Sequence, residues 1–300
     1  GDSILQSEYI LMKWILGHED EPRLPRLVDQ LKAQQDESGA WVQYPTPPGE
    51  GLGGGTCDVS ASVKAYLVLK LYGHDPADPQ MASARAKILA AGGAERCNTF
   101  TKFYLACLGL IPWTAQVTIP PELVFFPKWL YFHLDKLAAW TRTMVQPLAI
   151  VCAHRPARDL PVDIDELYAD PHNKSRVIMT NDRPHAFWTG FFAACDRVLK
   201  LYEKCPIKPR RQKALERMTQ WIEQHHEESE GMGAIFPPMV YTQVALRCMG
   251  YPDDHPLLVR LRQDLDDLMV YADGSRQRDH RQHGTTPPAE GPIRIQPCFS

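Results

Sequence analysis

The most informative absence in this sequence of 300 residues is that of β-strand signals. Apolar and polar side chains nowhere alternate for long with β-branched residues, and a half-buried strand requires that period of two. The chain also has no run of about 18 apolar residues, so we expect no transmembrane helix. Positive charge is not in excess either: the formal net charge is −3, which argues against a globally basic nucleic-acid-binding protein. These absences favour an all-α protein that binds no nucleic acid.

The eight cysteines contain no C-x-x-C pair, the spacing that zinc sites and redox motifs share. Most of them lie in apolar, helix-like contexts such as YLACLGL (104–110) and GFFAACDRV (190–198). A cysteine in such a context behaves as a small apolar residue. We therefore expect buried free thiols in a reducing compartment rather than disulfides or a zinc site.

Helical spacing of apolar residues recurs along the whole chain. Four segments look like copies of one unit, a short apolar helix that ends at a glycine: SEYILMKWILGHE (7–19), SASVKAYLVLKLYGHDP (60–76), TFTKFYLACLGLIP (99–112) and VYTQVALRCMGYPDD (240–254). Glycine ends a helix there because it takes the left-handed conformation at little cost. Amphipathic helices are also predicted in 27–41 and 214–234, each running into a glycine. This repetition indicates stacked helical hairpins.

Two segments interrupt the repeat. YPTPPGEGLGGGTCD (44–58) contains G-x-G-x-x-G at 49–54. The YPTPP before it cannot be the buried strand that a dinucleotide site requires, so we expect a loop and no such cofactor. DGSRQRDHRQHGTTPPAEGP (273–292) is polar and rich in turn-forming residues, and is expected to be an exposed loop.

A cluster of carboxylates in QDLDDLMVY (263–271) raises the question of a catalytic acid. A carboxylic acid that protonates an alkene must be buried and made unusually acidic by its neighbours. Leucines at 257, 261, 265 and 268 form the apolar stripe of this segment. Asp264, Asp266 and Asp267 lie off that stripe beside Arg260 and Arg262. We interpret them as a solvated helix face with local charge pairing, and not as an acid.

The histidines could suggest a metal, but their surroundings argue against it. The run HHEE at 225–228 ends a polar helix, and no other cluster of His or acidic residues has ligand spacing. We interpret it as a solvated helix end, and His280 and His283 as residues of the polar loop. The residues therefore predict no metal site.

Aromatic residues are concentrated in two places. The segment 183–204 is a wide apolar helix face with four large aromatic side chains near its start, Phe187, Trp188, Phe191 and Phe192. The basic segment KCPIKPRRQK (204–213) follows it. This pair fits a protein on a membrane surface, but also a core helix followed by a basic loop. The second place, 117–134, either fills a core or lines an apolar cavity, where ring faces would stabilise a cation.

Several motifs occur in an order that is typical of one protein family. GAW (39–41) after LKAQQ resembles the QW motif that joins neighbouring helices of an α-α barrel. Five further landmarks occur at about the spacing of that family: SEYILMKWIL (7–16), PPELVFFPKW (120–129), AAWTRTMVQPLAIV (138–151), GAIFPPMVYTQVAL (233–246) and RIQPCFS (294–300). Together they resemble the squalene–hopene cyclases, of the terpene cyclase family, over essentially the whole chain.

The resemblance implies an all-α fold, an α-α barrel (toroid) of helical hairpins with QW-type turns around a hydrophobic cavity. It implies that residues 1–20 belong to the catalytic barrel or its junction, that 21–290 form an inserted α-α barrel domain, and that 291–300 begin the return to the catalytic barrel. The implied activity is that of an isomerase that protonates squalene and cyclises it to hopene or hopanol through carbocations. No metal or organic cofactor is expected.

The resemblance also implies where such a protein works. Squalene dissolves in the membrane, so we expect a monotopic protein at the cytoplasmic face of the cell membrane. The aromatic residues Phe187, Trp188, Phe191 and Phe192 are then interpreted as facing the lipid. A homodimer is a further partner that the resemblance allows.

Individual positions carry over from the family. The residues implied to bind substrate are Trp140, Ile235, Phe236, Pro237 and Pro297, and those flanking the substrate channel are Leu137 and Val145. Glu8 matches a carboxylate that helps to poise the site, although helix capping would also explain it. Phe236 stands where the family often has Gln, which leaves the product open. Met232 replaces the aromatic residue of a second QW-like turn.

The family's catalytic acid is not among these matches. Its D-x-D-D-T motif follows RIQPCFS, whereas D-L-D-D at 264–267 precedes that landmark and is followed by Leu268. The chain opens on GDSILQSEY without Met and ends at Ser300. We therefore expect a fragment, inactive alone, with the acid beyond Ser300. The alternatives are an inactive helical-barrel scaffold that binds an isoprenoid, and a related oxidosqualene or sesquarterpene cyclase.

Overall fold

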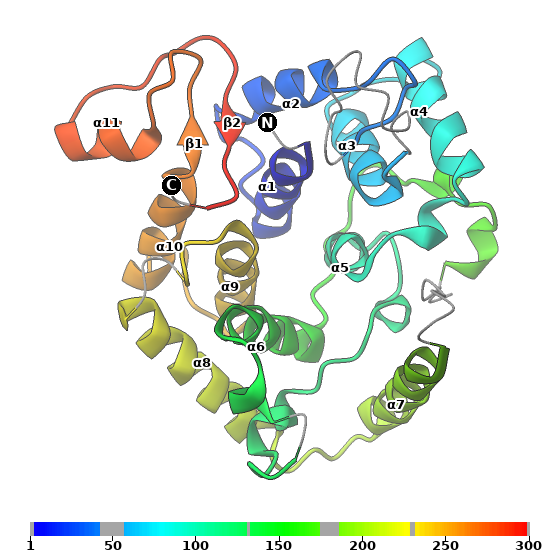
Figure 1. Cartoon of the computed structure of the whole chain (residues 1–300), viewed down its shortest axis with the longest axis vertical. Coiled ribbons are helices and arrows are strands. Elements are labelled where there is room, and N and C mark those ends of the chain that lie inside the picture. The colour runs from blue at the N-terminus through cyan, green and yellow to red at the C-terminus, as the bar shows by residue number, and fades with distance from the viewer. Residues whose placement is uncertain (1–2, 43–56, 131–132, 175–185, 229–231, 299–300) are drawn as a thin grey trace. The chain divides into compact units, whose positions relative to one another are not determined.

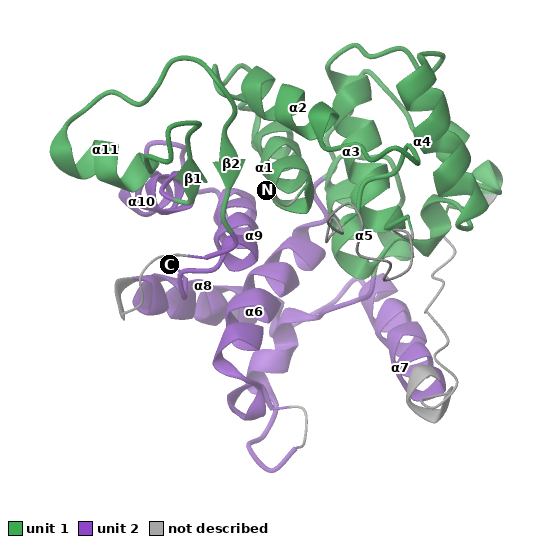
Figure 2. Ribbon diagram, turned by 45° about the horizontal axis from the view of Figure 1, so that its top comes forward, with its two compact units in different colours: residues 1–116, 157–178, 268–296 green, residues 117–156, 179–267, 297–300 purple. Residues whose placement is uncertain are grey.

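A computed structural model describes residues 3–42, 57–130, 133–174, 186–228 and 232–298 of the chain. Almost all of its regular structure is helical, which confirms the predicted all-α class (Figure 1). Its strands are β1 (Met269–Val270) and β2 (Arg294–Ile295), which pair antiparallel. The chain forms two compact units (Figure 2): unit 1 contains 1–116, 157–178 and 268–296, and unit 2 contains 117–156, 179–267 and 297–300. The predicted division at residues 20 and 290 stays a prediction.

Unit 1 is built around a helix that is buried on almost every side. Its α-helices are α1 (Ser3–Leu16), α2 (Leu24–Ala33), α3 (Val59–Leu71), α4 (Pro79–Ala90), α5 (Thr99–Cys107) and α11 (Gln277–His283). Its short 3-10 helices are η1 (Ala94–Arg96), η2 (Trp113–Ala115), η5 (Asp165–Leu167) and η6 (Pro171–Asn173). Helix α1 contacts α2, α3, α5 and β2, so its apolar residues need no single stripe.

Local sequence explains where the helices of unit 1 begin and end. Asp58 and Asn98 accept hydrogen bonds from Ala61 N and Thr101 N, as N-cap residues do. The four predicted stop glycines, at 17, 73, 109 and 250, all have positive φ. Past the glycine of α3, His74 N donates to Leu69 O at 3.1 Å, and the same bond recurs after α1, α5 and α9. The repeated helix stop is therefore confirmed as a shared Schellman-type turn.

The GAW turn after α2 is locked by backbone and side-chain contacts. Trp41 is fully buried, and its indole Nε1 donates to Leu31 O at 2.8 Å. The amide of Gln35 donates to Gly39 O and to Gln80 O, next to the start of α4. Gly39 has a φ of 88° and lies against Ser83, so a side chain there would collide with α4. The turn thus ties α2 to the next hairpin of unit 1.

Unit 2 is a smaller helical assembly. It contains η3 (Pro121–Phe125), η4 (Leu134–Lys136), α6 (Ala139–His154), α7 (Ala186–Lys204), α8 (Arg211–Glu228), α9 (Phe236–Cys248) and α10 (Pro256–Asp266). Helix α6 packs against α9 and α8, α10 packs against α9, and η3 packs against α8. Their apolar faces form the core of the unit, with Ile150, Met218 and Leu261 fully buried. In the part of the chain that the structure describes, no helix has the length and apolar content needed to cross a bilayer.

Two predictions about loops and cysteines need correction. The segment 273–292 is largely exposed, but it contains α11, which His280 links to the chain on either side through its contacts with Ser275 Oγ and Thr285 Oγ1. All eight cysteines are free, as predicted, but Cys205 and Cys298 are exposed rather than buried. Residues 43–56, with the G-x-G-x-x-G pattern, lie outside the described residues.

Candidate functional site

Four of the predicted substrate-binding residues come together at the start of α9. Ile235 is an extended residue just before the helix and pairs with Cys298 in an antiparallel bridge. The next residue, Phe236, donates from its backbone N to Pro297 O at 3.0 Å. This pairing brings residues 235–236 and 297–298 side by side within unit 2. Phe236 itself is fully buried, whereas Pro297 is exposed, and Ile235 and Pro237 are half-buried.

The other predicted substrate and channel residues lie on α6 or just before it, and α6 packs along α9. Trp140 is the second residue of α6, and its side chain is 59% exposed. Leu137, just before the helix, and Val145, within it, are half-buried. An exposed indole offers a ring face that can contact a hydrocarbon or a cation. The structure therefore places the residues predicted from 137–145 and 235–237 on neighbouring helices of one unit.

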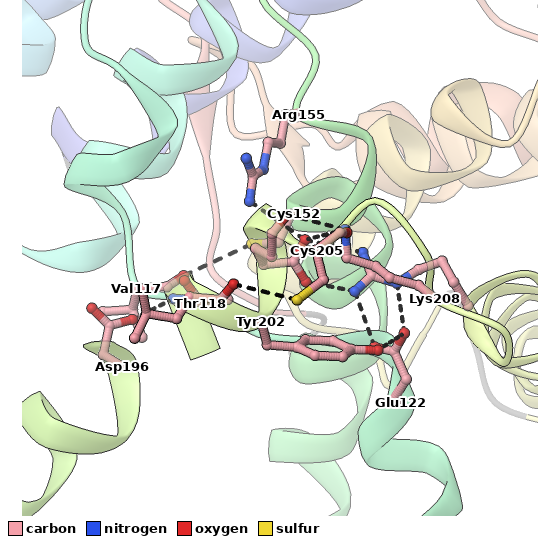
Figure 3. Close-up of polar contacts among 12 residues, drawn as sticks. Val117, Thr118, Glu122, Cys152, Arg155, Asp196, Tyr202, Cys205 and Lys208 are labelled. Atoms are coloured by element: carbon pink, nitrogen blue, oxygen red, sulfur yellow. Dashed lines mark hydrogen bonds and ion pairs between the residues drawn. The ribbon is translucent and has the colours of Figure 1, made fainter. Parts of the chain in front are cut away.

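A polar network anchors α7 within unit 2 (Figure 3). Asp196 accepts from Thr118 N at 2.9 Å and forms an ion pair with Lys200 at 2.7 Å. Tyr202 donates from its hydroxyl to Glu122 Oε1 at 2.9 Å. Arg211, at the start of α8, joins three elements, because it pairs with Glu122 of η3 at 2.7 Å and with Glu203 of α7 at 2.5 Å.

The electrostatics of this anchor keep its groups charged. Burial by itself raises the pKa of Glu122, but hydrogen bonds from Arg211 and from the backbone outweigh it and lower the pKa below its usual range. Burial lowers the pKa of Arg211, and its two carboxylate partners more than reverse that effect. The anchor therefore fixes one face of α7 with ion pairs that persist at neutral pH.

The opposite face of α7 is apolar and exposed. Asp196 and Glu203 are seven residues apart and share one side of the helix, which turns by about 100° per residue. Val198 and Leu201 lie on the other side, with exposed fractions of 64% and 63%. Towards the start of the helix, Phe191 and Phe192 are also exposed. Phe187 and Trp188 belong to α7, but their side chains lie outside the described residues.

Glu8 lies in unit 1, in the interior of α1, and forms a buried ion pair. Its Oε1 is 2.5 Å from Lys64 Nζ on α3, and its Oε2 accepts from Tyr104 Oη on α5 at 3.4 Å. The capping explanation is therefore wrong, because Glu8 does not lie in the first turn. Sequence reasoning missed Lys64, whose only signal is a charge within the apolar run SASVKAYLVL. Nearby on α1, the amide of Gln6 is buried with no hydrogen-bond partner within the described ranges.

In the aspartate cluster Asp264 is paired with Arg260 as predicted, but Asp264 and Asp267 are not solvated. Asp264 and Asp267 are almost completely buried. Asp264 forms an ion pair with Arg260 Nε at 2.9 Å, and its Oδ2 lies within hydrogen-bond distance of His226 Nε2, at 3.3 Å. This contact between α10 and α8 leaves His226 half-buried, which corrects the expected solvated helix end at that residue. Among the described residues no group of His, Cys and acidic side chains could hold a metal.

The family described as "Squalene-hopene cyclase N-terminal domain" matches residues 1–274 of this chain. The chain belongs to this family. Its helical structure agrees with the all-α toroid fold of squalene–hopene cyclase N-terminal domains.

Individual members of the family are similar along the same stretch. A squalene–hopene cyclase of Zymomonas mobilis is 32% identical over 303 residues, which cover 100% of this chain and 42% of that protein. One from Bradyrhizobium diazoefficiens is 32% identical over 91% of this chain and 40% of its own length. A dammaradiene synthase of Dryopteris crassirhizoma is 29% identical over 87% and 37%. The chain thus spans about two fifths of the length of these three relatives.

Proposed function

We propose that this chain is the N-terminal part of a triterpene cyclase that protonates squalene and cyclises it to hopene or hopanol through carbocations. The observation that carries the proposal is the family match over residues 1–274. The relatives at 32% identity are named squalene–hopene cyclases. Cyclisation of squalene to hopene is an isomerisation, because the carbon skeleton is rearranged and no atom is lost or gained. Only the route to hopanol adds a water molecule, which the last cation takes up.

In this proposal the chain supplies walls of the reaction cavity rather than the proton. Trp140 offers an exposed ring face that would stabilise a nearby carbocation. Ile235 and Pro237, half-buried at the start of α9, would restrict the conformation of the hydrocarbon chain beside Trp140. Asp264 is unsuited to the role of acid, because its carboxylate is taken up by Arg260 and His226. The acid is therefore sought in other parts of the intact protein.

The apolar face of α7 supports a second element of the proposal, attachment to a membrane surface. One side of α7 is held by ion pairs, and the other presents Val198 and Leu201 to the outside. Exposed lysines and arginines follow in the segment 204–213. An apolar stripe beside basic residues is the combination that binds at a lipid interface. A monotopic protein at the membrane could take up squalene directly from it.

Incubation of the intact protein with squalene, followed by mass analysis of the products, tests the activity. We expect cyclised products of the hopene type. Trp140→Ala should lower turnover at least tenfold or yield incompletely cyclised products, while Trp140→Phe should keep part of the activity. Phe100→Ala is the control, because Phe100 is also an exposed aromatic residue but is not among the residues predicted to bind substrate. Unreacted squalene alone would refute the cyclase and favour an isoprenoid-binding scaffold.

Flotation with phosphatidylcholine vesicles tests the membrane surface separately. Val198→Asp and Leu201→Asp should each reduce the bound fraction severalfold without loss of fold, because both side chains are already exposed. Leu89→Asp, at an exposed position of α4, is the control. Equal binding by all three variants would contradict the proposal that the exposed apolar face of α7 binds the membrane.

A further inference from the structure

A polar cavity in unit 2 has no role in the proposed cyclisation. It has a volume of about 190 Å³ and lies among α6, α8 and the segment that includes η4. Helix α6 contributes Arg142 and Gln146, one turn apart on the same face, and α8 contributes Arg217 and Trp221 with the same spacing. The segment before α6 contributes Lys128 and Asp135.

The charges around this cavity do not balance. Lys128, Arg142 and Arg217 are positive, and Asp135 is the acidic residue of the lining. Asp135 is 3.9 Å from Lys128 Nζ and 4.0 Å from Arg142 Nη1, which is too far for a hydrogen bond to either. Arg217 forms no ion pair with any residue that the structure describes. Its guanidinium instead lies over the ring of Phe125.

Hydrogen-bond donors in the cavity are also unused. The Nε of Arg142 is buried and has no hydrogen-bond partner among the described residues. Gln146 is only 3% exposed, lines the cavity and makes no side-chain hydrogen bond within the described part of the chain. Buried donors normally have partners, because leaving one unpaired costs free energy. A ligand that accepts hydrogen bonds would satisfy both groups.

The geometry points to a site for a phosphate group in this cavity. Three cations and one carboxylate leave two positive charges, which match a phosphate dianion. The planar guanidinium of an arginine binds two phosphate oxygens at once, and the Gln146 amide can donate to a third. The cavity volume is several times the roughly 30 Å³ that one water molecule occupies in the liquid. The phosphate belongs either to a free anion or to the monoester head group of a lipid.

Calorimetric titration of the intact protein with inorganic phosphate, in a phosphate-free buffer at low ionic strength, tests the free anion. We expect saturable binding of one phosphate per chain. Arg142→Gln and Arg217→Gln should each weaken it at least tenfold, and Arg142→Lys less than Arg142→Gln. Asp135→Asn should tighten binding at least threefold, because it removes the competing carboxylate. Lys213→Gln, an exposed lysine of α8 outside the cavity, should change it less than twofold.

Vesicle flotation tests the lipid source of the same group. Phosphatidylcholine vesicles with and without phosphatidic acid are compared for the wild type and for the double variant Arg142→Gln/Arg217→Gln. A gain from phosphatidic acid that the double variant loses assigns the site to a lipid head group. If phosphate binds in the calorimeter but phosphatidic acid does not increase flotation of the wild type over the double variant, the site is assigned to a free anion.

The site is refuted if neither phosphate nor phosphatidic acid binds in a way that depends on Arg142 and Arg217. It is also refuted if Lys213→Gln weakens binding as much as Arg142→Gln, since general surface charge would then suffice. Circular dichroism of each variant checks that the fold is kept, and a tighter Asp135→Asn variant cannot result from misfolding.

Discussion

The buried pair of Glu8 and Lys64 gives the sharpest quantitative prediction. Their side chains are 7% and 1% exposed, and α1, α3 and α5 surround them. Replacing Lys64 by Met leaves the Glu8 carboxylate buried with only the 3.4 Å contact from Tyr104. An uncompensated buried charge of this kind costs about 3–5 kcal/mol. Replacing both residues, as Glu8→Leu/Lys64→Met, should cost little, because apolar side chains fill the same space.

Hydrogen exchange followed by mass spectrometry can measure this loss of stability in the intact protein. Peptides from α1 and α3 report the free energy of opening in unit 1. A loss of about 3–5 kcal/mol corresponds to exchange that is faster by roughly 10²- to 4 × 10³-fold. Lys174→Met is the control, because its pair with Asp165 is partly exposed and should contribute about 1 kcal/mol or less.

The combined variant separates stability from function. If Glu8 only holds α1 against α3, the double variant should recover both stability and product formation from squalene. If Glu8 also poises the reaction, stability should return without turnover. The reasoning fails if Lys64→Met leaves exchange in α1 and α3 within about threefold of wild type, or if the double variant is as unstable as the single ones together.

Three further outcomes are expected. Because the folded-state pKa of Glu122 lies below the ordinary value of 4.5, its carboxylate stabilises unit 2 above pH 4.5, and this contribution is lost as pH falls through the folded-state pKa. Glu122→Gln should therefore lower the urea midpoint at pH 7 and make that midpoint depend less on pH in acid. Burial raises the pKa of Cys152 to about 12, so a thiol reagent at pH 8 should label the exposed Cys205 and spare Cys152 until unfolding; equal labelling rates would contradict this burial. Gly73→Ala should cost about 1–2 kcal/mol through its positive φ alone, and Gly39→Ala clearly more, because only Gly39 meets a neighbouring helix; equal shifts in melting temperature would argue against that contact.

Much of the helical pattern could be predicted because it is local. The stop at Gly73 needs only the residues of the last turn of α3 and the one after it, and the sequence contains them all. The N-cap at Asp58 is likewise decided by a residue three positions away. The collinear landmarks identified the family for a similar reason, since their order is written directly in the chain.

The roles of charged residues could not be predicted in the same way. The spacing within its own helix predicts a solvated Asp264, yet His226, 38 residues earlier, covers it from α8. The spacing of residues on one helix says which side chains share a face. It does not say whether water or another helix lies against that face.

The all-α class, the positions of the helix stops and the family can be predicted from the amino-acid sequence alone, because each depends on neighbouring residues or on their order. Three features depend on the folded arrangement: Lys64 neutralises Glu8 across 56 residues, α7 has an anchored and an exposed side, and α6 and α8 line a basic cavity. Desolvation and charge pairing produce all three, and both depend on distances in space that the packing of remote helices sets.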